Sequence, residues 1–195
     1  MLEHQAPLES ILQARGGHLI DEPGLRATFL CQGYLLLQSM SVSNLQEAIS
    51  SEIELELPAP QSSSARGQYA LLWLTPAEWL LNLPAAETES MQTALTRRLA
   101  TSLATVTDMS DAFACCELSD TRAPDVLMGG CSLEVHAHAF PGGRVSRTAL
   151  ADVPAIVWNP GDPNRYRCIV DRSFGVHFLN WLVDATHCRK SLSHT

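Results

Sequence analysis

Long apolar runs, aromatic residues and positive charge are all scarce in this chain of 195 residues. Aromatic side chains make up 6% of it, and 13 Lys and Arg stand against 21 Asp and Glu, which gives a formal net charge of −8. This negative charge disfavours nucleic acids and anionic membrane surfaces as partners, because both are polyanions. The longest apolar runs, "YLLL" and "ALLWL", are far too short to span a bilayer.

Signals for export, nucleotide binding and disulfide bonding are missing as well. The opening residues "MLEHQAPLES" lack the basic and apolar regions of a signal peptide, so we expect a cytoplasmic protein. The glycine pairs in "ARGGH", "LMGGC" and "FPGGR" form neither a GxGxxG nor a P-loop motif, so we expect turns there. We expect free, mostly buried thiols at the six cysteines, Cys31, Cys115, Cys116, Cys131, Cys168 and Cys188.

The chain does contain a regular succession of strand-like and helix-like segments. Strands or hairpins are predicted in "RATFLCQGYLLLQ" (one or two, interrupted at Gly33), "EIELELP", "YALLWLTPAEWLLNLP" (turn at Pro76), "LATVTDMSDAFACCELS" (one or two), "GGRVSRTALADVPAIVWNP" and "RYRCIV". Helices are predicted in "SVSNLQEAISSE" with a capping box of Ser43 and Gln46, over residues 87–101, in "TRAPDVLMGG" and in "SFGVHFLNWLVDA". The loop "PAPQSSSARG" and the stretch up to Pro23 are predicted to be irregular.

Together these elements predict an α+β fold, in which helices pack on an antiparallel sheet. A Trp-bearing strand, a turn with Pro, a second strand and an amphipathic helix occur around Trp73 and again around Trp158. We therefore expect two similar β-hairpin–helix halves. We expect an N-terminal arm over residues 1–28, a single domain over residues 29–188 and a C-terminal tail over residues 189–195.

The stretch "DRSFGVHFLNWLVDATHC" holds a Ser, a His and an Asp at helical spacing and could form a nucleophilic triad. Ser173 and His177 are four residues apart and could meet, but seven residues at ~1.5 Å each put Asp184 roughly 10 Å along the axis from His177. No GxSxG elbow surrounds Ser173, which occupies the place of a helix N-cap. We favour a capped amphipathic helix over a catalytic one.

A metal site is the next candidate. His136 and His138 alternate in "CSLEVHAHAF", a spacing that suits two ligands on one strand face, and Cys131 lies upstream. Zinc needs three or four converging ligands, and neither CxxC nor HExxH accompanies the pair. His187 and Cys188 form a terminal pair without defined geometry. Hydrogen-bonded or solvent-facing histidines are the favoured interpretation.

Asp108 and Asp111 in "TDMSDA" could serve as a general acid and base, but the setting favours turn and capping roles. From the residues alone we therefore expect no catalytic, cofactor-binding or metal-binding residue in this chain.

Three segments carry a resemblance. "ALLWLTPAEWLLNLP" is close to a Leu-Trp-Leu, Gly-Pro-Asp-Glu-Trp-Leu-Leu pattern, with Thr75 and Ala77 as departures. "VTDMSDAF" and "GGCSLEVHAHAFPGGR" are close to Val-x-Asp-x-Ser and Asp-Leu-His-Pro-Arg-Ala-Phe, with Ala137 and His138 in place of Pro-Arg. "DRSFGVHFLNWLVDATHC" follows an Arg-Ser-aromatic start with "WL" and "DA". The first two segments match at Trp73, Leu74, Pro76, Glu78, Trp79, Leu80, Leu81, Asp108, Ser110, His136, Ala139 and Phe140. In this order the segments resemble the γ subunit family of heterotetrameric sarcosine oxidases, over roughly residues 30–186.

The resemblance implies a complex of four different subunits that oxidises the N-methyl group of sarcosine on flavin. Electrons pass to oxygen to give hydrogen peroxide, and the one-carbon unit goes to tetrahydrofolate. It implies that the α and β subunits hold FAD, FMN, NAD and the folate site, that δ holds zinc, and that γ carries no redox group. An equivalent subunit of a related N-methyl amino acid oxidase or dehydrogenase, acting for example on N-methylglutamate, would look the same.

More distantly, the same region resembles the first folate-binding domain of glycine-cleavage aminomethyltransferases, which implies a folate-binding-like fold. Those enzymes carry a paired Asp before a strand like "AIV", where this chain has Val153 and Pro154. The Lys-Gly-Cys-Tyr-x-Gly-Gln motif of related folate-dependent proteins is also absent. The missing acid argues against independent one-carbon transfer, and a free-standing folate-binding protein remains an alternative.

Overall fold

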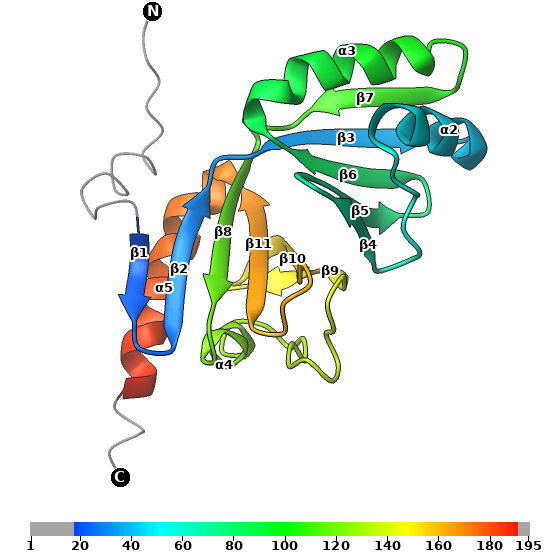
Figure 1. Ribbon diagram of the computed structural model, residues 1–195. Coiled ribbons are helices and arrows are strands. Elements are labelled where there is room, and N and C mark those ends of the chain that lie inside the picture. Colours follow the sequence, from blue (N-terminus) through cyan, green and yellow to red (C-terminus); the bar gives the residue numbers. More distant parts are fainter. Residues whose placement is uncertain (1–17, 191–195) are drawn as a thin grey trace, which may run out of the picture. The chain divides into compact units, whose positions relative to one another are not determined.

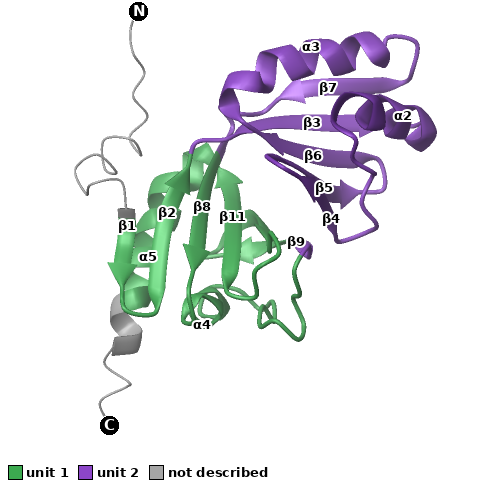
Figure 2. Cartoon of the chain, viewed as in Figure 1, with its two compact units in different colours: residues 1–30, 114–142, 147–195 green, residues 31–113, 143–146 purple. Residues whose placement is uncertain are grey.

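The computed structural model describes residues 18–190, which fall into two compact units (Figures 1 and 2). Unit 1 is formed by the residues up to Leu30, by Ala114–Gly142 and by the residues from Arg147 on. Unit 2 is formed by Cys31–Phe113 and Gly143–Ser146. The chain therefore passes between the units four times, after Leu30, Phe113, Gly142 and Ser146. Our boundaries of an arm, a single domain and a tail stay a prediction.

Unit 2 is a five-stranded sheet with two helices. Its elements are β3 (Gly33–Ser39), α2 (Val42–Ile53), β4 (Ser63–Arg66), β5 (Tyr69–Thr75), β6 (Glu78–Leu83), the short 3-10 helix η1 (Ala85–Glu87), α3 (Thr88–Arg98) and β7 (Ala104–Asp108). The strand order is β4-β5-β6-β3-β7, and all four pairings are antiparallel. Side chains from α2 and α3 pack with one face of this sheet in a single core, made of Leu35, Leu37, Leu45, Ala48, Ile49, Ile53, Leu55, Leu71, Trp79, Leu81, Leu83, Met91, Leu95 and Leu99.

Unit 1 is built on a six-stranded sheet. Its elements are β1 (His18–Glu22), β2 (Leu25–Leu30), β8 (Phe113–Ser119), α4 (Ala123–Met128), β9 (Val145–Leu150), β10 (Val153–Trp158), β11 (Arg165–Asp171), the 3-10 helix η2 (Arg172–Phe174) and α5 (Gly175–Lys190). The strand order is β1-β2-β8-β11-β10-β9. The core is centred on Tyr166, Phe140 and Phe178, all fully buried, and the Tyr166 hydroxyl donates to the Val135 carbonyl at 2.6 Å.

The two units share one arrangement of elements. In unit 2 the order β3-α2-β4-β5-β6-α3-β7 gives the sheet β4-β5-β6-β3-β7, and in unit 1 the order β8-α4-β9-β10-β11-α5 gives β9-β10-β11-β8. In unit 2 the first strand, β3, pairs with β7, which follows it in the chain. In unit 1 the corresponding strand, β8, pairs instead with β2, which precedes it in the chain. The predicted α+β class and the two similar hairpin–helix halves are therefore confirmed, with two antiparallel sheets where one was expected.

Two strands were missed in segments predicted to be irregular. β1 occupies His18–Glu22, inside the stretch up to Pro23, and pairs with β2. β4 lies in the Ser-rich loop and pairs with β5 from Ser63 to Arg66. Both are edge strands, each paired with one neighbour. β4 has no buried residue and is defined by its backbone pairing, whereas β1 buries only Leu19 and Ile20, which are adjacent and do not alternate with polar residues.

The capping box of Ser43 and Gln46 was wrong. The N-cap position of α2 is Ser41, two residues before Ser43, and no side chain caps the helix. The Gln46 side chain points instead to the segment beyond the helix, where its Oε1 accepts from the Leu57 N–H at 2.7 Å and its Nε2 donates to the Leu55 carbonyl at 3.2 Å.

The segment "EIELELP", predicted to be a short half-buried strand or extended segment, forms no strand. Ile53 ends α2, and Glu54 adopts a left-handed conformation with φ of 53° as the helix C-cap. Buried Leu55 and half-buried Leu57 follow in an irregular segment. The alternating pattern thus marks a helix end followed by an irregular segment that buries Leu55 and half-buries Leu57.

No helix in residues 18–190 is long and apolar enough to cross a membrane.

Candidate functional site

The residues of the proposed triad do not form one. Asp171 caps η2, and its Oδ1 accepts from the Ser173 N–H at 2.8 Å and from the Ser173 hydroxyl at 2.6 Å. His177 Nε2 donates to the Ala151 carbonyl at 2.9 Å, and Asp184 lies two turns further along α5, exposed. The N-cap predicted at Ser173 was wrong, because Asp171 is the capping residue and Ser173 lies inside the 3-10 turn.

These hydrogen bonds lower the pKa of Asp171, because the Ser173 hydroxyl and then its N–H favour the charged carboxylate. The Ser173 hydroxyl is thus committed to a carboxylate acceptor and not to an imidazole base.

The histidine pair lies in a turn and not on a strand, so the predicted strand face is wrong. His136 Nδ1 lies 2.7 Å from Glu134 Oε1, its Nε2 lies 3.5 Å from Asp125 Oδ1, and its ring stacks on His138 with centroids 6.3 Å apart. The His136 N–H and ring together lower the pKa of Glu134. Within residues 18–190 as far as they are described, no three His, Cys, Asp or Glu side chains converge as a metal site would need.

Asp108 and Ser110 make a turn at the end of β7. Asp108 Oδ1 accepts from the Ser110 N–H at 2.8 Å and from its hydroxyl at 2.6 Å. The Ser110 Oγ in turn accepts from the Tyr34 N–H of β3 at 3.0 Å. Asp111 is exposed beyond this turn. The Val-x-Asp-x-Ser segment therefore ties β7 to β3.

The described cysteines are reduced thiols outside any disulfide: Cys115, Cys116 and Cys168 are buried, Cys131 is half-buried and Cys31 is exposed. Burial raises the pKa of Cys116 and of Cys168 well above the usual thiol value. Both are therefore neutral at physiological pH, in line with a packing role. The side chain of Cys188 lies outside the described residues.

The matched tryptophans form the hairpin of unit 2. Trp73 of β5 and Trp79 of β6 are paired across the strands, and Trp79 is buried in the core. Glu78 begins β6 and accepts from the Gln38 side chain at 2.8 Å. These positions help to build the sheet of unit 2.

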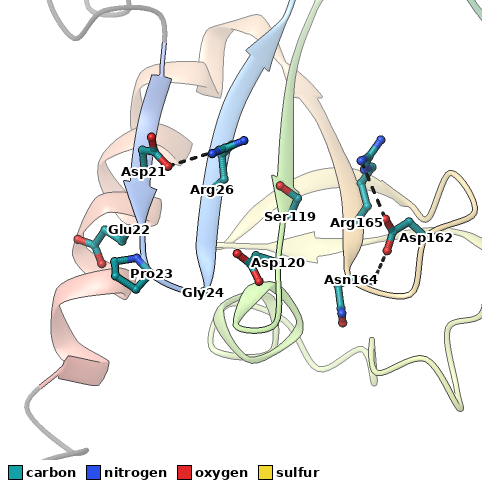
Figure 3. Close-up of a pocket in the computed structure, with 10 residues that line it drawn as sticks. All are labelled: Asp21, Glu22, Pro23, Gly24, Arg26, Ser119, Asp120, Asp162, Asn164 and Arg165. Carbon is teal, nitrogen blue, oxygen red and sulfur yellow. Dashed lines mark hydrogen bonds and ion pairs between the residues drawn. The ribbon is translucent and has the colours of Figure 1, made fainter.

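A polar pocket of about 630 Å³ in unit 1 is the structure's own candidate site (Figure 3). It lies where the β1–β2 turn, the end of β8 and the β10–β11 loop meet. The lining residues are Asp21, Glu22, Pro23, Gly24, Arg26, Ser119, Asp120, Asp162, Asn164 and Arg165. Sequence reasoning missed it, although its three parts, "DEPG", "SD" and "GDPN", are turn-like segments that follow or precede strands.

Two ion pairs join lining residues of this pocket, whereas Glu22 pairs with Arg122 outside the lining and Asp120 accepts from the Thr121 N–H. Arg26 Nε lies 3.4 Å from Asp21 Oδ1, and Arg165 Nη2 lies 3.9 Å from Asp162 Oδ2 (Figure 3). Asp162 Oδ1 also accepts from the Asn164 N–H at 3.0 Å. Such a surface of carboxylates, guanidiniums and amides can bind polar groups, but none of these contacts joins a nucleophile to a base. We assign it no catalytic step.

Comparisons with known proteins identify the relatives of this chain. Residues 40–188 match the family model described as "Sarcosine oxidase, gamma subunit family". The chain is 35% identical over 117 residues to a sarcosine oxidase subunit gamma of Corynebacterium sp. (strain P-1), and 34% identical over 117 residues to one of Arthrobacter sp. Each match covers 60% of this chain and 56% of the relative, so the matched region spans about half the length of these curated proteins.

Two solved structures show the same fold. A chain of heterotetrameric sarcosine oxidase from Corynebacterium sp. U-96, solved with pyrrole 2-carboxylate, gives a TM-score of 0.82 at 24% identity, over 94% of this chain and 95% of that one. The glycine cleavage system aminomethyltransferase T of Bartonella henselae gives a TM-score of 0.64 at 11% identity, over 91% of this chain and 56% of that one. The resemblance drawn from the sequence is confirmed: the chain belongs to the sarcosine oxidase gamma subunit family.

Proposed function

We propose that this chain is the γ subunit of a heterotetrameric sarcosine oxidase-type complex. The complex oxidatively demethylates sarcosine to glycine, transfers the one-carbon unit to tetrahydrofolate and produces hydrogen peroxide. The observation that carries this proposal is the family match over residues 40–188, which is most of the chain. The likeness of fold to a chain of a heterotetrameric sarcosine oxidase supports it.

In this proposal the chain supplies structure and not chemistry. Ser173, His177 and Asp108, which could have acted as nucleophile or base, all make short hydrogen bonds that hold turns or link elements. The partners are α, β and δ subunits, which hold FAD, FMN, NAD, tetrahydrofolate and zinc, and the complex works in the cytoplasm.

An equivalent role in a related N-methyl amino acid oxidase or dehydrogenase, such as one acting on N-methylglutamate, rests on the same family match. Substrate choice would lie in the flavin-bearing subunit. Turnover of the complex with sarcosine and with N-methylglutamate distinguishes the two.

The likeness to the aminomethyltransferase fold favours one second candidate, binding of folate by the chain itself. Calorimetric titration of the purified chain with tetrahydrofolate tests it. Tight, stoichiometric binding would support a free-standing folate-binding protein, and no heat of binding is expected from a structural subunit.

The proposed function is tested by expressing the chain with the flavoprotein subunits of a sarcosine oxidase-type complex from the same organism, with an affinity tag on this chain. We expect the flavin-bearing subunits to co-purify and hydrogen peroxide to form with sarcosine. The double variant Ser173→Ala/His177→Ala should keep the turnover of the wild-type complex, since neither side chain takes part in chemistry. A chain that never captures a flavoprotein partner would overturn the proposal.

A further inference from the structure

One end of unit 2 carries an exposed apolar patch, which we define as Met40, Val42 and Leu103. Their exposed fractions are 80%, 51% and 81%, the three highest among the large hydrophobic side chains of the described residues. Met40 follows β3, Val42 begins α2 and Leu103 precedes β7, so the patch lies where these elements meet (Figure 1). Met40 and Leu103 line one open groove of about 470 Å³ together with Ala77, Glu78 and Ala104.

The patch is held in place by its surroundings. The Met40 N–H donates to the Leu103 carbonyl at 3.1 Å, which extends the β3–β7 ladder, and the Ser39 N–H donates to the Ala77 carbonyl at 3.0 Å. Asn44 of α2 donates to the Ser102 hydroxyl at 2.9 Å. The backbone beneath the patch is therefore already ordered, so binding of a partner costs little conformational entropy there.

The charges around the patch favour a partner of opposite charge. Unit 2 has nine Asp and Glu against four Arg and no Lys. Glu78 lines the groove itself, and Glu47 lines the adjoining pocket with Arg98, whose guanidinium is paired with Glu52. A second copy of this chain would bring the same carboxylates to the contact, and like charges at a rim oppose association. A surface with apolar side chains bordered by Lys or Arg is complementary.

We propose that the Met40–Val42–Leu103 patch is a docking surface for another subunit of the complex, one that presents apolar side chains with a basic border. This inference rests on the proposed function, which requires partner subunits. Exposed apolar patches of this kind mark interaction sites when polar residues surround them. Charge at the rim adds orientation and rate of association.

The test uses the full complex, co-expressed with the neighbouring subunits, and compares Leu103→Asp and Met40→Asp with the wild type. Each variant places a carboxylate in the apolar contact. We expect the affinity of the chain for its partner subunit to fall at least about tenfold, as it does when a central interface residue is substituted. The matched control is Val176→Asp, an exposed apolar residue of α5 in unit 1. Circular dichroism and thermal unfolding of each isolated variant should equal those of the wild type.

The outcomes separate the two claims. Capture of flavoprotein by the wild type and by Val176→Asp, with its loss in Leu103→Asp, supports the docking surface. Equal capture by Leu103→Asp and the wild type overturns the docking surface and leaves the proposed function standing. Failure of the wild type to capture any partner overturns the proposed function and this inference with it. An isolated chain that is dimeric, and becomes monomeric in Leu103→Asp, would show that a second copy occupies the patch.

Discussion

At the scale of single residues, the polar side chains that suggested chemistry prove to be turn residues. Asp108 is the last residue of β7, and Asp171 is the last residue of β11. Each carboxylate accepts hydrogen bonds from the Ser two positions later, from its N–H at 2.8 Å and from its hydroxyl at 2.6 Å. The pattern Asp-x-Ser at a strand end favours this turn, because the short side chain competes for the backbone donors that follow. It was therefore open to prediction from sequence, whereas the contact of His177 with Ala151, 26 residues away, was not.

Ser173→Ala should raise the pKa of Asp171 toward the ordinary carboxyl value, since the hydroxyl is the first cause of its lowered pKa. A carboxylate with a lowered folded-state pKa stabilises the fold above its ordinary pKa, and that contribution is lost as pH falls through the lowered value. The free energy of unfolding of the variant should therefore fall less steeply as the pH is lowered through the acid range. A titration of the Asp171 carboxyl by NMR measures the shift, and an unchanged pKa in the variant would refute the assignment.

Gly33 has a packing role that its place in a strand does not reveal. A Cβ at this position would lie 2.1 Å from Oγ1 of Thr88, which is buried and donates to the Ala85 carbonyl. Gly33→Ala should lower the free energy of unfolding by about 1–3 kcal/mol, as overpacking of a filled site does. Denaturant unfolding measures the loss. The double variant Gly33→Ala/Thr88→Ala should recover part of it, and equal losses in the single and double variants would contradict the clash.

At the scale of elements, the long apolar or alternating strands were predictable and the short edge strands β1 and β4 were not. The β5–β6 and β10–β11 segments alternate or run apolar and were found, whereas β4, with the sequence "SSAR", carries no such signal and exists through pairing with β5. The capping box failed for a tertiary reason, because Gln46 binds the Leu55–Leu57 segment instead of the helix start. The polar pocket was missed because its three turns are distant in sequence and meet only in the folded unit.

The β9–β10 hairpin closes with two non-glycine residues at positive φ, Ala151 at 55° and Asp152 at 64°. This two-residue geometry, type I′, favours Gly at its second position. Asp152→Gly should raise the free energy of unfolding by about 0.5 kcal/mol, since a left-handed penalty of roughly 1 kcal/mol is partly offset by glycine's greater chain entropy.

A matched substitution at Asp162 should have the opposite sign. Asp162 is not at positive φ, and its carboxylate accepts from the Asn164 N–H and pairs with Arg165. Asp162→Gly should therefore destabilise the chain. If thermal unfolding gave both glycine variants the same sign, the turn argument would be wrong.

At the scale of the whole molecule, the chain is two units of one topology, each a sheet with two helices. The repeat was visible in the sequence as a recurrence of element types around Trp73 and Trp158. The pairing of β2 with β8, which corresponds to the pairing of β7 with β3 in unit 2, was not visible, because β2 and β8 are far apart in the chain. On this account the chain contributes to the assembly of the complex, through surfaces such as the patch of Met40, Val42 and Leu103.

The most direct measurement is native mass spectrometry of the complex formed when this chain is co-expressed with the subunits encoded beside it. The account predicts one copy of this chain in a particle with three different partner chains, and loss of that particle when this chain is omitted. A particle of the same partners that assembles and turns over sarcosine equally well without this chain, while the chain itself stays alone, would contradict the account.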